Sequence, residues 1–313
     1  MDEKRNNLDL DQHNVNADKL HRYGTAALIG RPNAGKSTLV NRLVGEKVAI
    51  VTDKPQTTRT RIMGIVSKPD WQMVLFDAPG VHKPKDKLGR NMMSAALDVL
   101  EWADVVYYIV DASIPFGSGE AYILRILDNI TKPVFLLLNK LDLMEKEALL
   151  PVIASYQEKR SFAQVFPISA LQGDNTEELM EATVAYFQEG PAVYLEEEYT
   201  DQAERIIAGE IIREKAILAT REEVPYSLTV YIEKMERRPS GLYDVYAVIV
   251  VDQPGQKGIL IGKRGATLKQ IGTDARKEIE ELLGENVNLQ IWVKMKEGWR
   301  DKDAQLREYG LGG

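Results

Sequence analysis

Two glycine-rich loops that carry basic side chains lie more than two hundred residues apart in this sequence. The first, GRPNAGKST, spans residues 30–38, and the second, GKRG, spans residues 262–265. Glycine lets backbone amides approach an anion closely, and lysine or arginine adds the opposite charge. The sequence therefore predicts two separate sites that contact phosphate groups, and the elements around each loop must decide which phosphates these are.

The first loop matches the pattern G-x-x-x-x-G-K-[ST], in which backbone N–H groups surround nucleotide phosphates at the start of a helix. We expect Lys36 to reach the β- and γ-phosphates and the Ser37 hydroxyl to ligate Mg²⁺. The alternative is a glycine turn that only caps a helix. The residues expected to contact the phosphates are Gly30, Arg31, Pro32, Asn33, Ala34, Gly35, Lys36, Ser37 and Thr38.

The tetrapeptide NKLD at residues 139–142 predicts which base the site takes. The Asp142 carboxylate can accept hydrogen bonds from guanine N1–H and from the exocyclic amine, a donor pair that adenine lacks. The stem of Lys140 can lie across the base, and Asn139 can brace the neighbouring phosphate loop. Alone, the tetrapeptide would more often be a turn that starts a helix. The residues expected around the base are Asn139, Lys140, Leu141 and Asp142, with the backbone of Ser169 and Ala170 in the segment ISA.

The segment DAPG, residues 77–80, supplies the other half of a nucleotide site. Asp77 can hold Mg²⁺ through water, and the Gly80 N–H can meet a γ-phosphate oxygen; Ala78 and Pro79 lie between them. Upstream, the threonine-rich segment DKPQTTRTR offers a further Mg²⁺ ligand from either of two adjacent threonines, although such a pair is usually only solvated. The residues assigned to Mg²⁺ are Ser37, Thr57, Thr58 and Asp77, and those assigned to hydrolysis are Asn33, Lys36, Thr57, Thr58 and Gly80.

The second loop has a weaker motif, because G-x-x-G also occurs at residues 255–258 and 310–313. Only the middle copy follows an apolar triplet and precedes apolar residues spaced by three and four, which mark one face of a helix. Its glycines would let a nucleic acid backbone approach, and the apolar floor would accommodate unstacked bases. The alternative is a structural helix–turn–helix with a solvated basic tip. The residues expected to bind RNA are Ile261, Gly262, Lys263, Arg264, Gly265 and Lys269.

Short apolar strands alternate with helical periods over the first two thirds of the chain, which predicts an α/β domain with a mostly parallel sheet and helices on both faces. After the segment EGPAVYLEEEYT the order changes to an amphipathic helix, two strands, the second glycine loop, a helix and a strand. This order predicts a small α+β domain. We therefore divide the chain into a mobile tail (1–22), an α/β domain (23–190), a linker (191–201) and an α+β domain with a C-terminal helix (202–313).

The composition is ordinary for a globular protein, with 313 residues of which 44% are hydrophobic and 28% charged. No apolar run approaches the roughly 18 residues of a membrane span, and the N-terminus lacks the apolar core of a secretory signal. The absence of cysteine excludes disulfides and fits a reducing cytosol. The net charge of −7 argues against nucleic-acid binding. Between positions 257 and 277, however, the sequence has six basic residues and only one acidic residue. Such a local surplus can attract a polyanion.

Taken in order, the phosphate loop, the threonine-rich segment, DAPG, NKLD and ISA resemble the translation-factor-related small GTPases across residues 25–187. The second loop and its neighbours resemble a KH domain of the bacterial type across residues 202–296. The pair resembles the Era family of bacterial ribosome-assembly GTPases. This resemblance implies a P-loop GTPase that uses GTP or GDP and Mg²⁺, binds the 3′ end of small-subunit ribosomal RNA, and acts in assembly of the small ribosomal subunit. We expect a cytoplasmic monomer, with a fraction peripheral at the inner membrane.

Hydrolysis is expected to depend on a monovalent cation. Val81 stands where many signalling GTPases carry the glutamine that orients water, and valine cannot form that hydrogen bond. In related GTPases with a hydrophobic residue there, the resemblance implies a phosphate-loop asparagine and K⁺; Asn33 and the carbonyls of residues 56–59 would form the cage here. The alternative is that Asn33 only tolerates an unusual backbone angle. His82 is interpreted as a surface-loop residue rather than as a base.

Two other functions compete with an RNA-binding GTPase. A signalling or membrane-associated GTPase would share the first site, but its C-terminal domain would bind a protein partner. Loss of RNA binding on exchange of both Lys263 and Arg264 for glutamate would separate these two hypotheses. A metabolic P-loop kinase would need an acceptor site that the sequence does not show, and the combination of NKLD with DAPG argues against it.

Overall fold

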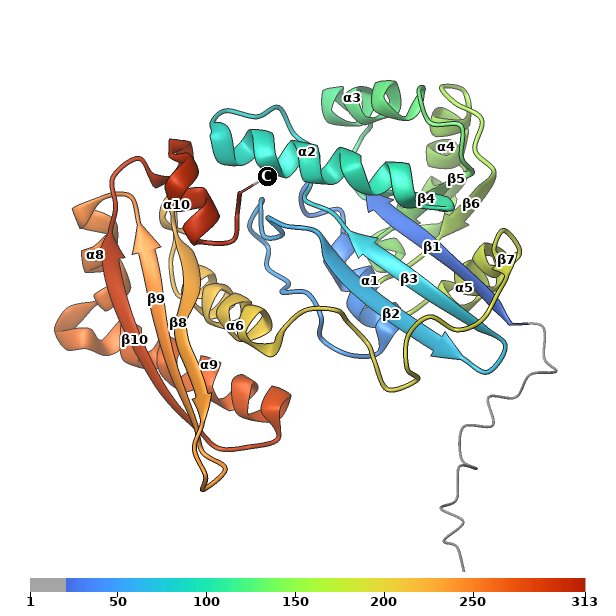
Figure 1. Cartoon of the computed structure of the whole chain (residues 1–313). Helices are drawn as coiled ribbons and strands as arrows, with labels where there is room; N and C mark the ends of the chain where they lie inside the picture. Colours follow the sequence, from blue (N-terminus) through green and yellow to red (C-terminus); the bar gives the residue numbers. More distant parts are fainter. Residues whose placement is uncertain (1–20, 313) are drawn as a thin grey trace, which may run out of the picture.

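The computed structural model describes residues 21–312, so most of the expected mobile tail lies outside the described residues. Two domains lie side by side, and the chain passes between them through the segment before α6 (Figure 1). The first domain contains β1 (Arg22–Ile29), α1 (Lys36–Val44), β2 (Ile62–Lys68), β3 (Trp71–Asp77), α2 (Lys87–Trp102), β4 (Val105–Asp111), α3 (Ser118–Leu127), β5 (Val134–Asn139), η1 (Leu141–Leu143), α4 (Lys146–Gln157), β6 (Gln164–Pro167), α5 (Thr176–Val184) and β7 (Gln188–Glu189).

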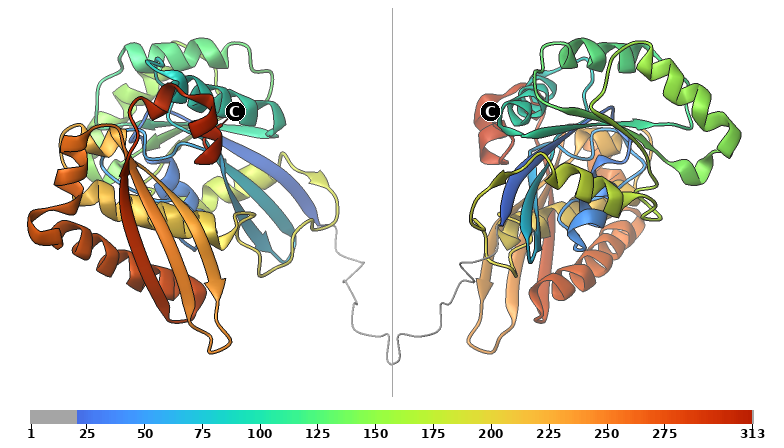
Figure 2. Two further views of the ribbon diagram at one scale, coloured as in Figure 1. Left: turned by 60° about the vertical axis from the view of Figure 1, so that its left-hand side comes forward. Right: turned by 90° about the vertical axis from the view of Figure 1, so that its right-hand side faces the viewer.

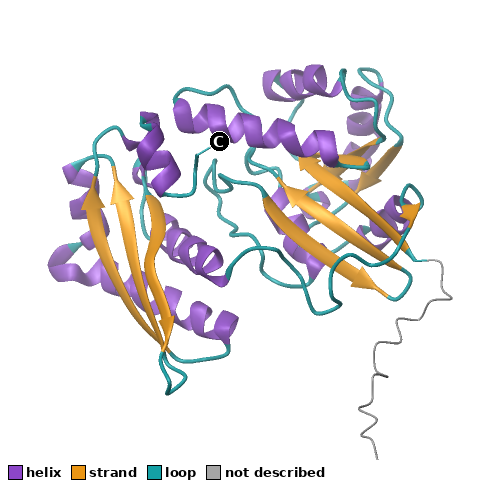
Figure 3. Ribbon diagram, viewed as in Figure 1, coloured by secondary structure: helices purple, strands orange, loops and turns teal. Residues whose placement is uncertain are grey.

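The sheet of the first domain has the strand order β2-β3-β1-β4-β5-β6, and β7 pairs with the start of β1. The strands from β3 to β6 are parallel, whereas β2 runs antiparallel to β3. Alternate residues of β1 face opposite sides: Ala27 and Ile29 pack toward α2, α3 and α4, and Ala26 and Leu28 toward α1 and α5. Helices therefore cover both faces (Figure 3), which confirms the predicted α/β class.

This topology brings the motifs of the first domain to one edge of the sheet. The phosphate loop follows β1, DAPG begins at the last residue of β3, NKLD begins at the last residue of β5, and ISA follows β6. The carboxyl ends of parallel strands lie together, and open α/β sheets bind their ligands there. Gly45 caps α1 with a φ of 85°, the left-handed conformation in which glycine commonly ends a helix.

The second domain contains α6 (Glu204–Leu218), α7 (Val224–Ser227), β8 (Thr229–Arg237), β9 (Tyr243–Val251), α8 (Pro254–Ile261), η2 (Lys263–Gly265), α9 (Ala266–Leu283), β10 (Val287–Met295), η3 (Trp299–Asp301) and α10 (Asp303–Glu308). Its sheet has the order β10-β9-β8, with β9 parallel to β10 and antiparallel to β8. Helices α6 and α9 cover one face of this sheet (Figure 2). The predicted order of a helix, two strands, the glycine turn, a helix and a strand is confirmed.

Three elements differ from the expectations. Helix α4 lies between β5 and β6, where its internal Pro151 hides the helical period, and the sequence analysis missed it. The segment TEELMEATVAYFQE predicts a helix over residues 176–189, but α5 ends at Val184 and the chain then forms β7. The linker is bound rather than free, because the Ile65 N–H donates to the Tyr199 carbonyl at 2.9 Å along strand β2. The proposed domain boundaries, after residues 22, 190 and 201, remain a proposal.

The domains meet in an apolar contact between α2 and the end of the chain. Leu88 and Met92 of α2 are buried against Trp299 and Leu306 of the second domain. The expected amphipathic helix is α6, but it is largely buried, and its buried charged residues Arg213 and Glu214 form hydrogen bonds with the first domain. The apolar contact involves α2, which follows the DAPG loop, and the polar contact of α6 involves Val51 and Thr57. The second domain therefore contacts two segments that adjoin the nucleotide site.

Candidate nucleotide site and nucleic-acid interface

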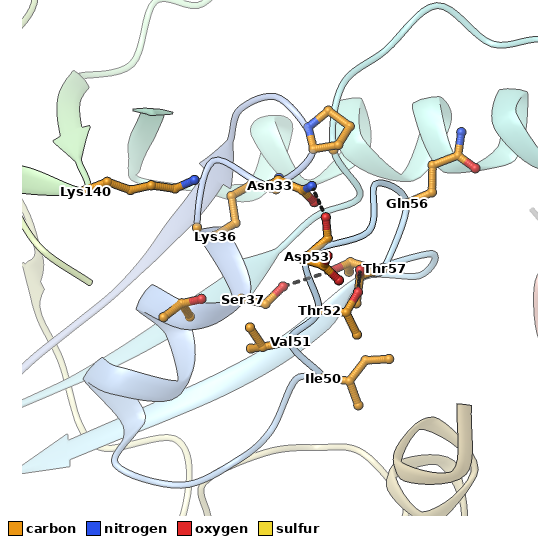
Figure 4. A pocket seen from close by; sticks show the side chains of 15 residues that line it. Asn33, Lys36, Ser37, Ile50, Val51, Thr52, Asp53, Gln56, Thr57 and Lys140 are labelled. Carbon is orange, nitrogen blue, oxygen red and sulfur yellow. Dashed lines mark hydrogen bonds between the residues drawn. The ribbon is translucent and has the colours of Figure 1, made fainter. Parts of the chain in front are cut away.

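A pocket of about 360 Å³ opens at the carboxyl edge of the first sheet (Figure 4). Ten of its lining residues were predicted: Pro32, Asn33, Gly35, Lys36, Ser37, Thr38, Thr57, Thr58, Gly80 and Lys140. Five more come from the segment after α1, and of these only Gln56 was expected, through its carbonyl in the potassium cage: Ile50, Val51, Thr52, Asp53 and Gln56. The phosphate loop, the threonine-rich segment, the DAPG loop and NKLD therefore meet in one cavity, as their order in the sequence predicted.

The glycines of the phosphate loop have no room for a side chain. A Cβ on Gly30 would lie 2.3 Å from the Ile109 carbonyl oxygen, and one on Gly35 would lie 2.1 Å from Asn139 Nδ2. Gly35 also has a φ of 100°, which disfavours any L side chain. These contacts explain why the motif needs glycine at both positions.

Lys36 is held inside the loop rather than in solvent. Its Nζ donates to the Arg31 carbonyl at 3.1 Å, and the side chain is almost fully buried. Burial lowers the pKa of Lys36, and the nearby Asp77 carboxylate opposes this shift. A buried ammonium beside free backbone amides suits the phosphates of a nucleotide, which would supply the missing negative charge.

The hydroxyl group of Thr58, and not that of Thr57, lies at the predicted magnesium position. Ser37 Oγ lies 2.9 Å from Thr58 Oγ1 and donates to Asp77 Oδ2 at 2.5 Å. Thr57 Oγ1 instead donates to the Lys54 carbonyl at 2.7 Å. The sequence could not separate the two threonines, because the distinction depends on how the loop folds.

The donor set around Asp77 fits a magnesium ion that shares its ligands with phosphate. Asp77 is fully buried and its Oδ1 has no hydrogen-bond partner, so one oxygen is left for a metal-bound water. Burial raises the pKa of Asp77, while Lys36 and the two hydroxyls oppose the rise. Among residues 21–312 no group of three or more His, Cys, Asp or Glu side chains could hold a metal. A site with two hydroxyls and one carboxylate therefore needs phosphate oxygens to complete it.

The base-recognition residues are held by hydrogen bonds to both neighbouring loops. Asn139 Nδ2 donates to the Ala34 carbonyl at 2.8 Å, and Asn139 Oδ1 accepts from the Ala170 N–H at 2.9 Å. Ser169 Oγ donates to Asp142 Oδ1 at 2.6 Å, which orients the carboxylate. Asn139 thus braces the phosphate loop as the sequence suggested, and the serine of ISA acts through its side chain, which the sequence analysis did not anticipate.

Asp111 is a further member of this site that the motifs did not reveal. Lys140 has a φ of 70°, and its Nζ donates to Asp111 Oδ2 at 2.5 Å. Burial raises the pKa of Asp111, but hydrogen bonds from Lys140 and Ser113 outweigh it and the pKa is lowered. Its place as the last residue of β4, at the same sheet edge as the other motifs, was the signal that could have identified it.

Two side-chain contacts tie the phosphate loop and DAPG loop to the threonine-rich segment. Asn33 has a φ of 64°, and its Nδ2 donates to the Asp53 carbonyl at 2.7 Å. His82 is half-buried, with Nδ1 2.7 Å from the Gly80 carbonyl and Nε2 3.1 Å from Gln56 Nε2. It is therefore not a free surface-loop residue. Val81 is buried, and its N–H donates to the Gly30 carbonyl at 3.0 Å.

The second glycine loop has the opposite character. Gly262 has a φ of 71°, and a Cβ there would lie 2.1 Å from Thr267 Oγ1. Lys263 and Arg264 are exposed, and within the described part of the chain neither side chain has a hydrogen bond or an ion pair. Lys269 is exposed one turn further along α9. The loop thus presents two adjacent cations on a turn between helices, as predicted.

The remaining residues of the second loop also lie where the sequence placed them. Ile261 is partly buried against the apolar core of the second domain, so it forms the expected floor beside the turn. Gly265 has a φ of 80° and starts α9. At Gly255 and Gly258, by contrast, nothing lies within 4 Å of an added Cβ, so that copy of the motif does not need glycine for space.

Comparisons with known proteins cover nearly the whole chain. A family described as "50S ribosome-binding GTPase" matches residues 25–140, and a KH domain family matches residues 223–300. A protein named GTPase Era from Lacticaseibacillus paracasei is 47% identical over 290 residues, which cover 93% of this chain and 97% of that one. GTPase Era from Leuconostoc citreum is 46% identical over 296 residues, with 94% and 98% covered.

Two solved Era structures share both domains with this chain. A variant of Aquifex aeolicus Era bound to GDP·AlF4⁻ is 37% identical with a TM-score of 0.90, and the match covers 93% of this chain and 100% of that chain. Era in complex with MgGDPNP and nucleotides 1506–1542 of 16S ribosomal RNA is 37% identical with a TM-score of 0.89, over 94% and 100%. Both domains and their order are therefore shared across the full match.

Proposed function

This chain belongs to the Era family of GTPases, and from that membership we propose that it is a GTP-dependent RNA-binding switch of small-subunit assembly. It binds GTP or GDP with Mg²⁺ in the first domain and hydrolyses GTP to GDP and phosphate. Its KH domain binds small-subunit ribosomal RNA near the 3′ end, the segment that is present in the related Era complex.

The observation that carries this proposal is the presence of two phosphate-contacting loops of different character on one chain. The first is closed around a buried lysine and is braced by Asn139, which suits a small nucleotide. The second is an exposed basic turn whose Gly262 has no room for a side chain, which suits a strand that lies against the backbone. A GTPase whose second domain bound only protein would give no reason for this second loop.

In the nucleotide site each residue has a proposed task. Lys36 and the backbone amides from Gly30 to Thr38 hold the phosphates, and Gly80 N–H approaches the γ-phosphate. Ser37 and Thr58 would hold Mg²⁺ directly, and Asp77 would hold it through water. When bound, the ion would supply positive charge that stabilises the phosphates during hydrolysis. Asp142 selects guanine, and Asp111 holds Lys140 in its position beside the base.

The potassium cage stays part of the proposal. Val81 is apolar and buried, so the chain lacks the usual water-orienting side chain after DAPG. Asn33 lies beside the threonine-rich segment, but its nitrogen, not its oxygen, faces the Asp53 carbonyl. A cation between the phosphates and this segment would require the Asn33 amide to turn over, so that its oxygen becomes a ligand. The positive φ of Asn33 also agrees with the alternative, in which asparagine is needed only for the backbone conformation of the loop. This backbone role and a role as a cation ligand do not exclude each other.

The partners and the location extend the same proposal. We place the protein on the assembling small subunit and in the cytoplasm, as a monomer with a fraction peripheral at the inner membrane. No helix within residues 21–312 is both long and apolar enough to cross a bilayer. Flotation of the purified protein with vesicles of anionic phospholipid tests the membrane part separately from the RNA part.

The experiment that tests the function is a binding titration with an RNA of the 3′-terminal small-subunit sequence. Full-length protein loaded with a non-hydrolysable GTP analogue should bind this RNA more tightly than a scrambled RNA of equal length. Crosslinking to cellular RNA in the GTP- and GDP-bound forms should then map to the same segment. Equal affinity for both RNAs, or crosslinks spread over unrelated RNAs, would refute the proposed target.

A further inference from the structure

Two adjacent residues of helix α6 point away from their own domain and into the nucleotide-binding domain. Arg213 is 1% exposed and Glu214 is 4% exposed, although both carry charges that usually remain at the surface. Buried charges need partners, and both find them in the segment that precedes Arg59 in the first domain. The contact therefore joins the KH domain to the wall of the nucleotide pocket.

Glu214 holds the start of that wall. Its Oε1 accepts from the Val51 N–H at 3.0 Å, and its Oε2 accepts from Lys47 Nζ at 2.6 Å and from Lys215 Nζ at 2.8 Å. Burial alone would raise the pKa of Glu214, but these donors outweigh it and lower the pKa, so the carboxylate stays charged near neutral pH. Glu278 of α9 also pairs with Lys47 and Lys215, which ties the helix after the second glycine loop to the same group.

Arg213 holds the end of the same wall. Its Nη2 donates to the Thr57 carbonyl, and Glu210 fixes the guanidinium through bonds of 2.8 Å and 2.6 Å. Between the two anchors, Thr52 Oγ1 and Thr57 Oγ1 lie 2.7 Å apart, so the segment 51–57 folds back on itself. Thr58 follows directly, with its hydroxyl 2.9 Å from Ser37 Oγ.

We propose that Arg213 and Glu214 of the KH domain are positioning residues for GTP turnover, because they clamp both ends of the segment 51–57 and so place Thr58 at the magnesium site. Neither side chain lines the nucleotide pocket; each acts through a backbone group of the segment that does. The inference rests on the proposed function, and it identifies the part of the RNA-binding domain that acts on the GTPase site. It follows that movement of α6 would loosen the segment 51–57 and with it Thr58.

The clamp has a specific kinetic signature. GDP contacts the phosphate loop and NKLD but needs no ligand from Thr58, whereas γ-phosphate and Mg²⁺ draw that threonine in. Loss of the clamp should therefore lower kcat and the affinity for a GTP analogue while it leaves the GDP affinity unchanged. A residue that only stabilises the domain contact would change both affinities together, or neither.

The test uses the full-length protein and five single variants: two that act on the clamp, two controls and one conservative exchange. Arg213→Met removes one anchor of the clamp and Glu214→Gln removes the charge of the other, while Arg238→Met and Glu236→Gln are matched controls at exposed ion pairs of the KH sheet. We expect about tenfold lower kcat and about tenfold weaker binding of a non-hydrolysable GTP analogue for the first two variants, because each substitution removes a charged hydrogen-bonding group. GDP affinity should stay within about twofold in these two variants and in the two controls, and Arg213→Lys should recover part of the loss because it keeps a cationic donor.

The outcomes separate this inference from the function on which it rests. A wild-type protein that neither binds nor hydrolyses GTP would refute the proposed function itself. An active wild type with clamp variants that match the controls would refute only the clamp. A parallel loss of affinity for GDP and for the GTP analogue would also refute the clamp, because that result would indicate damage to the fold. Glu214→Gln keeps size and an acceptor oxygen, so it provides the answer if Arg213→Met does not fold.

Discussion

The two glycine loops of this chain contact phosphate by opposite means. In the phosphate loop the cation Lys36 is buried and bonded to backbone carbonyls, and a side chain at Gly30 or Gly35 would collide with the Ile109 backbone or with Asn139. In the second loop Lys263 and Arg264 are exposed and their side chains have no partners among the described residues, and of its two glycines only Gly262 lacks space for a Cβ.

This difference shows how one type of residue can serve two kinds of ligand. A closed loop surrounds a small ligand with fixed donors, so its selectivity comes from directed hydrogen bonds such as those of Asp142. An open loop leaves its charges in water, so its affinity comes from counterion release and falls steeply with salt. Substitutions of the directed donors and acceptors in the nucleotide site, such as Asp142, should therefore alter which nucleotide binds, and those at the second loop should alter how tightly RNA binds.

The largest effect is expected at Asp142. Exchange of Asp142 for Asn removes the charged acceptor for guanine N1–H and the exocyclic amine, each contact being worth about 1.5–3 kcal/mol. GTP affinity should fall by about a hundredfold or more, and xanthosine triphosphate, which has a carbonyl in place of the amine, should bind better. Titration of both nucleotides measures this. Asp128→Asn, at an exposed site, is the control, and unchanged GTP affinity in Asp142→Asn would contradict the assignment.

Charge reversal at the second loop should leave the first site intact. A variant with Lys263→Glu and Arg264→Glu should lose RNA affinity by about a hundredfold, and its dependence on salt should become shallower by about 0.7 for each RNA phosphate that the variant no longer neutralises. GTP turnover without RNA should be unchanged. Fluorescence anisotropy across a salt series provides both numbers, with Lys68→Glu as a control charge reversal in the other domain. RNA binding equal to wild type would favour a protein-binding second domain instead.

The substitution Gly262→Ala tests whether an RNA backbone must approach the second loop closely. Gly262→Ala places a Cβ against Thr267 at a φ of 71°, so RNA affinity should fall by about tenfold and the loop should be strained by about 1–3 kcal/mol. Gly258→Ala, inside α8 with free space around the Cβ, should bind RNA normally. Equal RNA affinities of the two variants would mean that the glycine is not needed for approach.

The smallest effect concerns the cation at the first loop. If Asn33 takes part in a potassium cage, GTP turnover should be severalfold faster in potassium than in sodium at fixed ionic strength, and Asn33→Ala should lose that difference. Steady-state phosphate release measures both. Equal wild-type rates in the two salts would leave Asn33 with only its backbone role and its bond to Asp53.

Much of the nucleotide site could be predicted from the sequence because its motifs are local. Each of GKS, DAPG and NKLD follows a strand of a parallel sheet, so the fold brings them together at one edge without further information. The choice between Thr57 and Thr58 could not be predicted, since neighbouring residues of a loop share the same composition and only the path of the backbone separates their side chains.

The domain contact was beyond sequence reasoning for a different physical reason. Arg213 and Glu214 lie more than one hundred and fifty residues from the segment that they hold, and adjacent charges on a helix normally indicate a solvated face. Helix α4 was missed because Pro151 lies inside it, a position that normally argues against a helix. The partners of Arg213 and Glu214, and the presence of a helix around Pro151, can be identified only once the fold is known.

The central claim is that the nucleotide at the first loop controls RNA at the second. The most direct measurement is the affinity of the full-length protein for the 3′-terminal small-subunit RNA with GDP and with a non-hydrolysable GTP analogue. We predict tighter RNA binding with the analogue, and RNA must then tighten analogue binding by the same factor, because coupling between two sites is reciprocal. Identical RNA affinities in the two nucleotide states would show two independent modules and would contradict this account.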